Sequence, residues 1–354
     1  MSETESLEDE DAKSKGILWG FGVFIGVVVL ALVILGAWWG DEPDLFDIEE
    51  EAVERYSQEG IAGDTLVKLT DLPVGYVYTN TLAHMAEVLM HKPGGYITND
   101  VAPPGVFLDN IQSWEYGALI MLRDAATALR NHFSRDQSQS AEDVDLAVAE
   151  PYFYYERNSW ALPSTESEYQ KGIDLLHAYM SRLKQPKGKQ KRGQFYARAD
   201  NLWQYSEVVI KRLGGLSTRL GASTDRHEAQ AIMPLDVLPT LEKTKKATGS
   251  LLARTPWLEI DDVFYEARGA CWALLHILKS IKHDFDLILE DKRAMRTVES
   301  MIYSMENALT PILSPMILSG NGFGLLANYS LSMANYIARA NAAALDLRDI
   351  MNRG

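Results

Sequence analysis

The chain has 354 residues, of which 47% are hydrophobic and 23% are charged, so it carries too much apolar material to be wholly disordered. Its single cysteine, Cys271, excludes an intrachain disulfide, a zinc ribbon and a redox Cys-x-x-Cys motif. A formal net charge of −15 excludes a broadly basic surface for nucleic acid, and the length suggests about two domains.

The acidity is concentrated in two short segments. Residues 1–16 carry six acidic side chains and two lysines, and residues 41–55 carry eight acidic side chains and one arginine. Between them, residues 17–39 form 23 consecutive uncharged and mostly apolar residues. Most of the net charge therefore flanks one apolar segment and says little about the rest of the protein.

The segment 17–39 is long enough to cross a hydrocarbon core of about 30 Å as a helix. A buried core helix rarely has so many uncharged residues, and a cleaved signal peptide has a shorter apolar run followed by a small-residue cleavage site. We therefore expect a transmembrane signal-anchor that contacts the lipid bilayer. Lys13 and Lys15 precede the segment, which predicts that residues 1–16 form an acidic tail in the cytoplasm.

Four glycines, Gly16, Gly20, Gly22 and Gly26, form two pairs spaced by four residues in and next to this segment. This spacing lets two helix backbones approach closely, which would make a homodimer. Glycine is also simply common in membrane helices, and the sequence leaves both interpretations open.

The remainder predicts an all-α protein, because alternating runs of β-branched residues are nearly absent after residue 40. We expect an acidic juxtamembrane helix and linker over 40–78, followed by a multi-helix bundle over 79–354. Within 79–354, a helix at 79–91 would begin at Thr79 or Thr81. A capping box of Thr165 and Glu168 would start the helix 166–183. The other long helices are predicted at 108–132, 195–213, 235–252, 258–283, 288–309 and 325–349.

Two parts of the bundle show internal similarity. Residues 104–133 and 256–285 align without gaps and share six identities, among them Gly117/Gly269 and Phe133/Phe285. This predicts two repeated helical units, 104–220 and 256–347. Amphipathic helices also align by chance, so a single irregular bundle is the alternative.

The segment 130–169 is rich in aromatic and charged residues. We consider a ligand or partner contact through its members Tyr152, Tyr154, Glu156, Arg157 and Trp160, together with Trp114 and Glu115 from the preceding helix. The alternative is a loop that covers the core with its aromatic side chains. A paired-carboxylate glycosidase would use Glu115 and Glu156, and it requires a deep pocket that Trp114 and Trp160 also line.

No metal site and no cofactor are expected, because the histidines lack the usual ligand spacing and no phosphate-binding glycine loop occurs. His276 lies in an apolar run and is predicted to be a hydrogen-bonded core residue. Cys271 is predicted to be a buried small hydrophobic residue.

Several stretches, including KPGGYITNDVAPPG (92–105), LDNIQSWEYGAL (108–119) and SWALPSTESEYQKGI (159–173), resemble the bacterial domain-of-unknown-function 2333 family. The resemblance extends over nearly the whole chain. It implies an anchored protein of the bacterial inner membrane with a periplasmic C-terminal domain, and it implies no activity.

The sequence therefore favours a single-pass membrane protein whose helical domain binds or scaffolds an envelope protein, and a non-enzyme is expected. The alternative is a periplasmic binder or hydrolase that acts on cell-wall glycan or lipid.

Overall fold

The computed structural model describes residues 2–58, 67–135, 141–186, 192–222, 255–312, 317 and 328–353. Helices make up its regular structure, and no strand occurs among these residues. The prediction of an all-α protein is therefore confirmed for this part of the chain. The predicted helix 235–252 lies outside the described residues.

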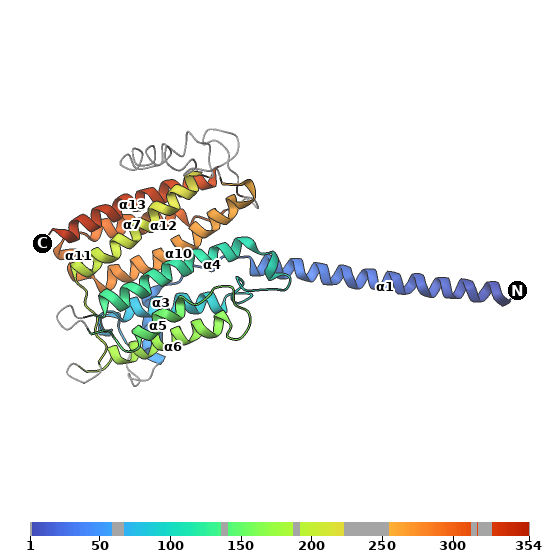
Figure 1. Cartoon of the computed structure of the whole chain (residues 1–354), viewed down its shortest axis with the longest axis horizontal. Coiled ribbons are helices and arrows are strands. Elements are labelled where there is room, and N and C mark those ends of the chain that lie inside the picture. The colour runs from blue at the N-terminus through green and yellow to red at the C-terminus, as the bar shows by residue number, and fades with distance from the viewer. Residues whose placement is uncertain are drawn as a thin grey trace.

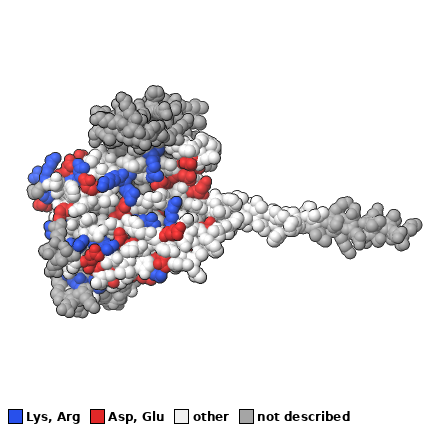
Figure 2. Space-filling model, in the orientation of Figure 1, with Lys and Arg blue, Asp and Glu red and all other residues white. Residues whose placement is uncertain are grey.

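Helix α1 (Ser2–Trp39) projects away from the rest of the molecule, and only its C-terminal end contacts the bundle (Figure 1). Its part Leu18–Trp39 is long and apolar enough to cross a membrane, and its residues are not buried inside the protein. It is therefore not a core helix of the bundle. Where α1 leaves the bundle it carries no charged atoms, whereas positive and negative side chains are mixed over the bundle surface (Figure 2).

The bundle has three layers of helices, and the middle layer is a parallel pair, α4 (Asp109–Ala128) and α10 (Ile260–Asp284) (Figure 1). Near the start of the pair, Ser113 Oγ donates a hydrogen bond of 3.0 Å to Asp262. Beyond its end, the rings of Phe133 and Phe285 lie 5.0 Å apart. These contacts fix the direction of both helices.

The outer layers cover the two sides of this pair. On one side lie α7 (Ala199–Ala222), α12 (Met295–Ala308) and α13 (Tyr329–Asn352). On the other side lie α3 (Tyr76–His91), α5 (Leu146–Phe153) and α6 (Thr165–Leu183), and α2 (Ile48–Gln58) packs on α3. The short α11 (Asp286–Asp291) follows α10. One hydrophobic core runs through all three layers.

The central pair packs closely because each helix presents a glycine to the other. A Cβ atom on Gly117 would lie 1.9 Å from the carbonyl oxygen of Glu266, and one on Gly269 would lie 1.9 Å from that of Trp114. Any larger residue would therefore push the two backbones apart. The predicted repeat pairs these same two glycines.

The pair α7 and α13, in contrast, is antiparallel, since Glu207 near the start of α7 contacts Arg348 near the end of α13 at 3.2 Å. The duplication itself stays a prediction.

Several helix bounds differ from the prediction. The predicted helix 288–309 is two helices, α11 and α12, separated where Arg293 has a φ of +57°. The helices predicted to begin at 195 and 325 begin at Ala199 and Tyr329.

Helix α3 begins at Tyr76 rather than at Thr79 or Thr81, because the buried carboxylate of Asp284 accepts backbone N–H groups of Gly75 at 2.8 Å and Tyr78 at 2.7 Å. A residue of α10 thus caps α3 from a distance of about 200 positions in the chain. The start of α6 is capped by Ser164, whose hydroxyl accepts from the backbone N–H of Ser167.

Candidate functional site where α1 meets the bundle

The segment 41–47, here called the strap, leaves α1 and runs along α10. The carboxylate of Glu42 accepts two N–H groups of Arg268 at 2.6 and 2.7 Å. The indole N–H of Trp272 donates to the carbonyl oxygen of Asp44 at 3.1 Å. Two residues further along the strap, the backbone N–H of Phe46 donates to Nε2 of His276 at 3.2 Å. Every second residue of the strap is therefore bonded to every fourth residue of α10.

This ladder follows from the dimensions of the two backbones. Two residues of extended chain advance about 6.6 Å, and four residues of helix advance about 6.0 Å. Successive contacts therefore stay in step along the helix. Three hydrogen-bonded positions hold the strap, so the bundle is not suspended from α1 on a free linker.

His276 is neutral in this arrangement. The N–H of Phe46 can only donate, so Nε2 accepts, and Nδ1 carries the proton that it shares with the carbonyl oxygen of Trp272 at 2.8 Å. Burial lowers the pKa of His276 to about 4. The ring of Phe46 stacks on the imidazole with centroids 3.9 Å apart. The prediction of a hydrogen-bonded core histidine is confirmed, as is the burial of Cys271, whose pKa burial raises to about 12.

A second connection joins the end of α1 to the loop 92–108. Gly94 has a φ of +82°, a conformation that favours glycine, and a Cβ atom there would lie 2.7 Å from the ring of Trp39. Earlier in the same helix, a Cβ atom on Gly36 would be in ordinary contact with Pro104 at 3.5 Å. The loop and the last turns of α1 thus fit closely.

Glu115 of α4 holds this loop in place. Its buried carboxylate accepts the backbone N–H groups of Ile97 at 2.9 Å and Thr98 at 2.8 Å, and it forms an ion pair of 2.7 Å with the buried Lys92. Burial raises the pKa of Glu115, and Lys92 opposes that shift. Glu115 therefore has an architectural role at this site.

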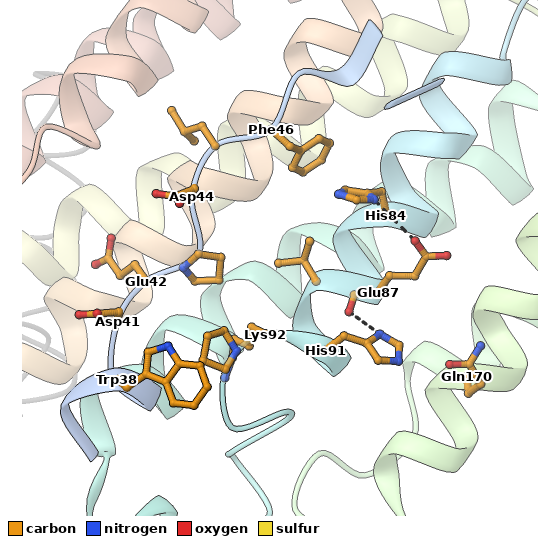
Figure 3. A pocket seen from close by; sticks show the side chains of 14 residues that line it. Trp38, Asp41, Glu42, Asp44, Phe46, His84, Glu87, His91, Lys92 and Gln170 are labelled. Atoms are coloured by element: carbon orange, nitrogen blue, oxygen red, sulfur yellow. Dashed lines mark hydrogen bonds and ion pairs between the residues drawn. The ribbon is translucent and has the colours of Figure 1, made fainter. Parts of the chain in front are cut away.

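Between the strap and α3 lies an open cleft with a volume of about 990 Å³ (Figure 3). The strap forms one wall and the C-terminal half of α3 forms the other, with Trp38 of α1 at one end and Gln170 of α6 at the side (Figure 3). Both walls carry charged and apolar groups. The lining consists of Trp38, Asp41, Glu42, Pro43, Asp44, Leu45, Phe46, His84, Glu87, Val88, His91, Lys92, Pro93 and Gln170.

The α3 wall contains a fully engaged carboxylate, Glu87. Arg55 donates to it at 2.9 and 2.5 Å, and His177 and His84 lie 3.1 and 3.6 Å from it. Burial acts to raise the pKa of Glu87, but the hydrogen bonds from His177, His84 and Arg55 hold it well below its usual range. Glu87 is therefore a fixed negative charge and is poorly suited to donate a proton at neutral pH.

On the strap wall the carboxylates of Asp41 and Asp44 have no ion-pair partner among the described residues. These two side chains point away from α3 (Figure 3), so they place negative charge at the rim of the cleft, beside apolar surface from Trp38, Leu45 and Phe46. Such a lining suits a group that carries an amine. Within the described ranges no three His, Cys, Asp or Glu side chains are placed to hold a metal ion.

The structure separates the residues that the sequence singled out. Trp114 and Glu115 are 0% exposed in the core, whereas Glu156 and Trp160 lie at the surface. These four side chains do not line one pocket, so the glycosidase pocket predicted from them is not formed. The physical reason is that Trp114 packs on Trp272 between the central helices, with ring centroids 5.2 Å apart.

The remaining members of the aromatic segment lie on the outside of α4 and α6. Arg157 stacks over Tyr116 at 4.2 Å, and Lys171 lies over the ring of Tyr152 at 5.6 Å. Half of Tyr154 is exposed, and Arg123 lies 5.4 Å from its ring centroid. The segment also covers the core, because Phe153 is fully buried. Contact with a ligand or partner stays a prediction for its exposed side chains.

Sequence reasoning missed the strap contacts on α10 and the ion-pair cluster around Glu87. The spacing of Arg268, Trp272 and His276 at every fourth position was a visible signal for a segment lying along that helix. No local signal in the sequence joins Arg55 and His177 to Glu87.

A family model described as an uncharacterized protein conserved in bacteria (DUF2333) matches residues 12–354, nearly the whole chain. No curated protein and no solved structure matches the chain.

Proposed function

We propose that this chain, which belongs to the DUF2333 family of uncharacterized bacterial proteins, is a single-pass inner-membrane protein whose periplasmic helical domain binds or scaffolds other envelope proteins. The projecting apolar helix Leu18–Trp39 supports the anchor. Lys13 and Lys15 support a cytoplasmic N-terminus, because positive residues next to a span favour the cytoplasmic side.

The observation that carries the scaffolding role is the strap. A domain that captures small ligands works equally well on a flexible tether. A domain that positions other proteins gains from a fixed height and orientation above the membrane. Here Glu42, Asp44 and Phe46 bond to α10 immediately after the apolar helix, which leaves no room for a flexible tether.

The chemistry of the cleft supports binding rather than catalysis. Glu42 and Glu87 are held in ion pairs with Arg268 and Arg55, and the depressed pKa of Glu87 removes it as a general acid. A glycosidase needs one carboxyl group with a raised pKa facing its substrate. Glu115 has a raised pKa but lies in the core, where it bonds to the loop 92–98.

A second candidate function, the binding of a cell-wall glycan fragment or lipid headgroup that carries an amine, is supported by the size and charge of the cleft. A volume of about 990 Å³ lies at the upper end of ligand pockets in general. Calorimetric titration of the full chain with phosphoethanolamine or glucosamine tests this candidate. Binding that Asp44→Asn weakens and the surface change Asp349→Asn leaves unchanged would support it, and no heat of binding to either compound would count against it.

The topology is tested with an alkaline phosphatase fused after Gly354. This enzyme is active only outside the cytoplasm, so we expect activity from this fusion and none from the same phosphatase placed before Met1. An expressed but inactive C-terminal fusion would overturn the orientation.

The interaction role is tested by placing a photo-crosslinking amino acid at Tyr154 in intact cells. A matched control is Tyr303 of α12, which is similarly exposed on another face of the bundle. We expect a discrete protein adduct from position 154 and none from position 303. A chain that forms no adduct from position 154 or from positions 152 and 157 would contradict a partner on the aromatic segment.

A further inference from the structure

The end of the bundle from which α1 emerges carries a concentration of exposed apolar side chains. They are provided by three loops that precede α4, α6 and α10. The most exposed are Val101, Phe107, Trp160, Leu162, Trp257 and Leu258. The other large hydrophobic side chains that are exposed on the described part of the bundle are mostly scattered, as Leu287 and Tyr303 are.

Hydrogen bonds and packing place these three loops on one face. The loop 92–108 lies against α1, since side-chain atoms of Pro104 and Leu108 lie 3.5 and 3.8 Å from the position that a Cβ atom on Gly36 would take. The loop before α6 joins it through Asn99, whose side chain donates to the carbonyl oxygen of Ser159 at 2.9 Å. The loop before α10 lies beside the start of α4 because Ser113 bonds to Asp262. This face, here called the end face, therefore surrounds the root of α1.

The height of the end face follows from the length of the apolar helix. The 22 residues Leu18–Trp39 extend about 33 Å, slightly more than a hydrocarbon core of about 30 Å. Gly36, where an added Cβ atom would lie 3.5 Å from Pro104, lies about 4.5 Å below Trp39 along the axis. The loop 101–107 therefore reaches the level at which a spanning helix passes from acyl chains to headgroups.

We infer that the end face rests on the bilayer that α1 spans, with Phe107, Leu162 and Leu258 inserted among the headgroups and upper acyl chains. This inference rests on the proposed anchor. Aromatic and aliphatic side chains at this depth partition into the interface, and the uncharged surface of α1 continues onto the bundle at its root (Figure 2). The face thus continues an apolar surface that already belongs to the membrane.

The charges at this end indicate which lipid the face prefers. The loop before α6 carries one exposed basic side chain, Arg157. Exposed acidic side chains outnumber it, because Asp109 and Glu259 lie at the ends of the loops before α4 and α10 and Asp41 lies at the start of the strap. These acidic side chains repel anionic headgroups, so attachment depends on apolar insertion into a zwitterionic surface. A basic surface would instead bind through lipid charge and respond strongly to salt.

The test uses the full chain reconstituted in zwitterionic nanodiscs, with a nitroxide label on a single introduced cysteine. Cys271 is buried and its raised pKa keeps it unreactive. The variants Phe107→Cys, Leu162→Cys and Leu258→Cys report on the end face. Leu287→Cys, at a site as exposed as Phe107 but at the opposite end, is the matched control. Val29→Cys reports on α1.

We expect labels at 107, 162 and 258 to lose collisions with a water-soluble nickel complex and to keep collisions with oxygen, whereas the label at 287 stays open to nickel. Water exposure at all three end-face positions, with position 29 in lipid, would overturn the inference and leave the anchor intact. Water exposure at position 29 as well would overturn the anchor. Protection that appears only in native membrane vesicles, and not in nanodiscs, would assign the end face to a protein partner and overturn the lipid contact.

Discussion

Replacing Glu42 by alanine should release part of the strap while leaving the bundle folded. The change leaves the guanidinium group of Arg268 buried without its counter-charge. Removing one partner of a buried ion pair costs about 3–5 kcal/mol. Arg268 keeps a hydrogen bond of 3.1 Å to the carbonyl oxygen of Thr310, and part of the Glu42 side chain faces solvent. We therefore expect a cost of about 2–3 kcal/mol for the docked strap.

A cost of this size corresponds to a roughly 30- to 150-fold higher population of the undocked strap, at a factor of ten per 1.4 kcal/mol. Hydrogen exchange of the Phe46 amide measures this population, because that amide is bonded to His276 when the strap is docked. The full chain in detergent or nanodiscs is suitable. Within the segment 41–47 the Phe46 amide should exchange faster by this factor, whereas peptides from α4 and α10 should keep their protection.

The matched control is Glu207→Ala, which breaks a partly exposed pair with Arg348 on α13. Surface pairs contribute about 0–1 kcal/mol, so exchange of the strap should not change. Equal exchange of the strap in the wild type and in Glu42→Ala would refute the argument that the ion pair holds it. Simultaneous loss of protection throughout the bundle would show that the strap and the core unfold together.

Three further predictions concern the central pair, the strap histidine and α1. Gly269→Ala should lower the free energy of unfolding by about 1–3 kcal/mol or more, because the new Cβ would lie 1.9 Å from a carbonyl oxygen of α4. The control Gly215→Ala meets no atom within 4 Å and should leave the thermal melt nearly unchanged. Burial lowers the pKa of His276 from 6.5 to about 4, so the folded state with the docked strap favours the neutral imidazole. Its stability should therefore fall as the pH drops from 6.5 toward 4, by about 2 kcal/mol at pH 5. His276→Gln should remove this pH dependence, measured as hydrogen exchange of the strap. If α1 dimerises through the pair Gly22 and Gly26, leucine at either position should abolish the dimer in crosslinking of reconstituted protein, and an unchanged dimer would exclude that interface.

Local patterns predicted the helices well and their exact starts poorly. The predicted helix 166–183 is observed as α6, Thr165–Leu183, because its apolar spacing and the polar residues before it are local features. Its cap is Ser164 rather than Thr165, since the Thr165 hydroxyl donates to the carbonyl oxygens of Glu156 and Ser159. Two neighbouring hydroxyl residues offer the same capping chemistry, and only the fold of the preceding loop decides between them.

The site could not be predicted in the same way, because its contacts join distant parts of the chain. Glu115 was singled out as a catalytic candidate from its aromatic neighbour, yet its carboxylate bonds to the backbone of residues 97 and 98 and to Lys92. A glutamate that stabilises a loop and a glutamate that transfers a proton look alike in sequence. Burial and partners distinguish them, and both depend on the tertiary fold.

The two connections of α1 end on different members of the central pair. The strap is bonded to α10 through Arg268, and the loop that packs on Trp39 is bonded to α4 through Glu115. Both connections use buried charged groups, which tolerate little change in geometry because an unpaired buried charge is costly. The close contact at Gly117 and Gly269 then ties α4 to α10. A tilt of α1 against the bundle would therefore have to break an ion pair or separate the central helices, so the domain should follow the orientation of α1 rather than swing beneath it.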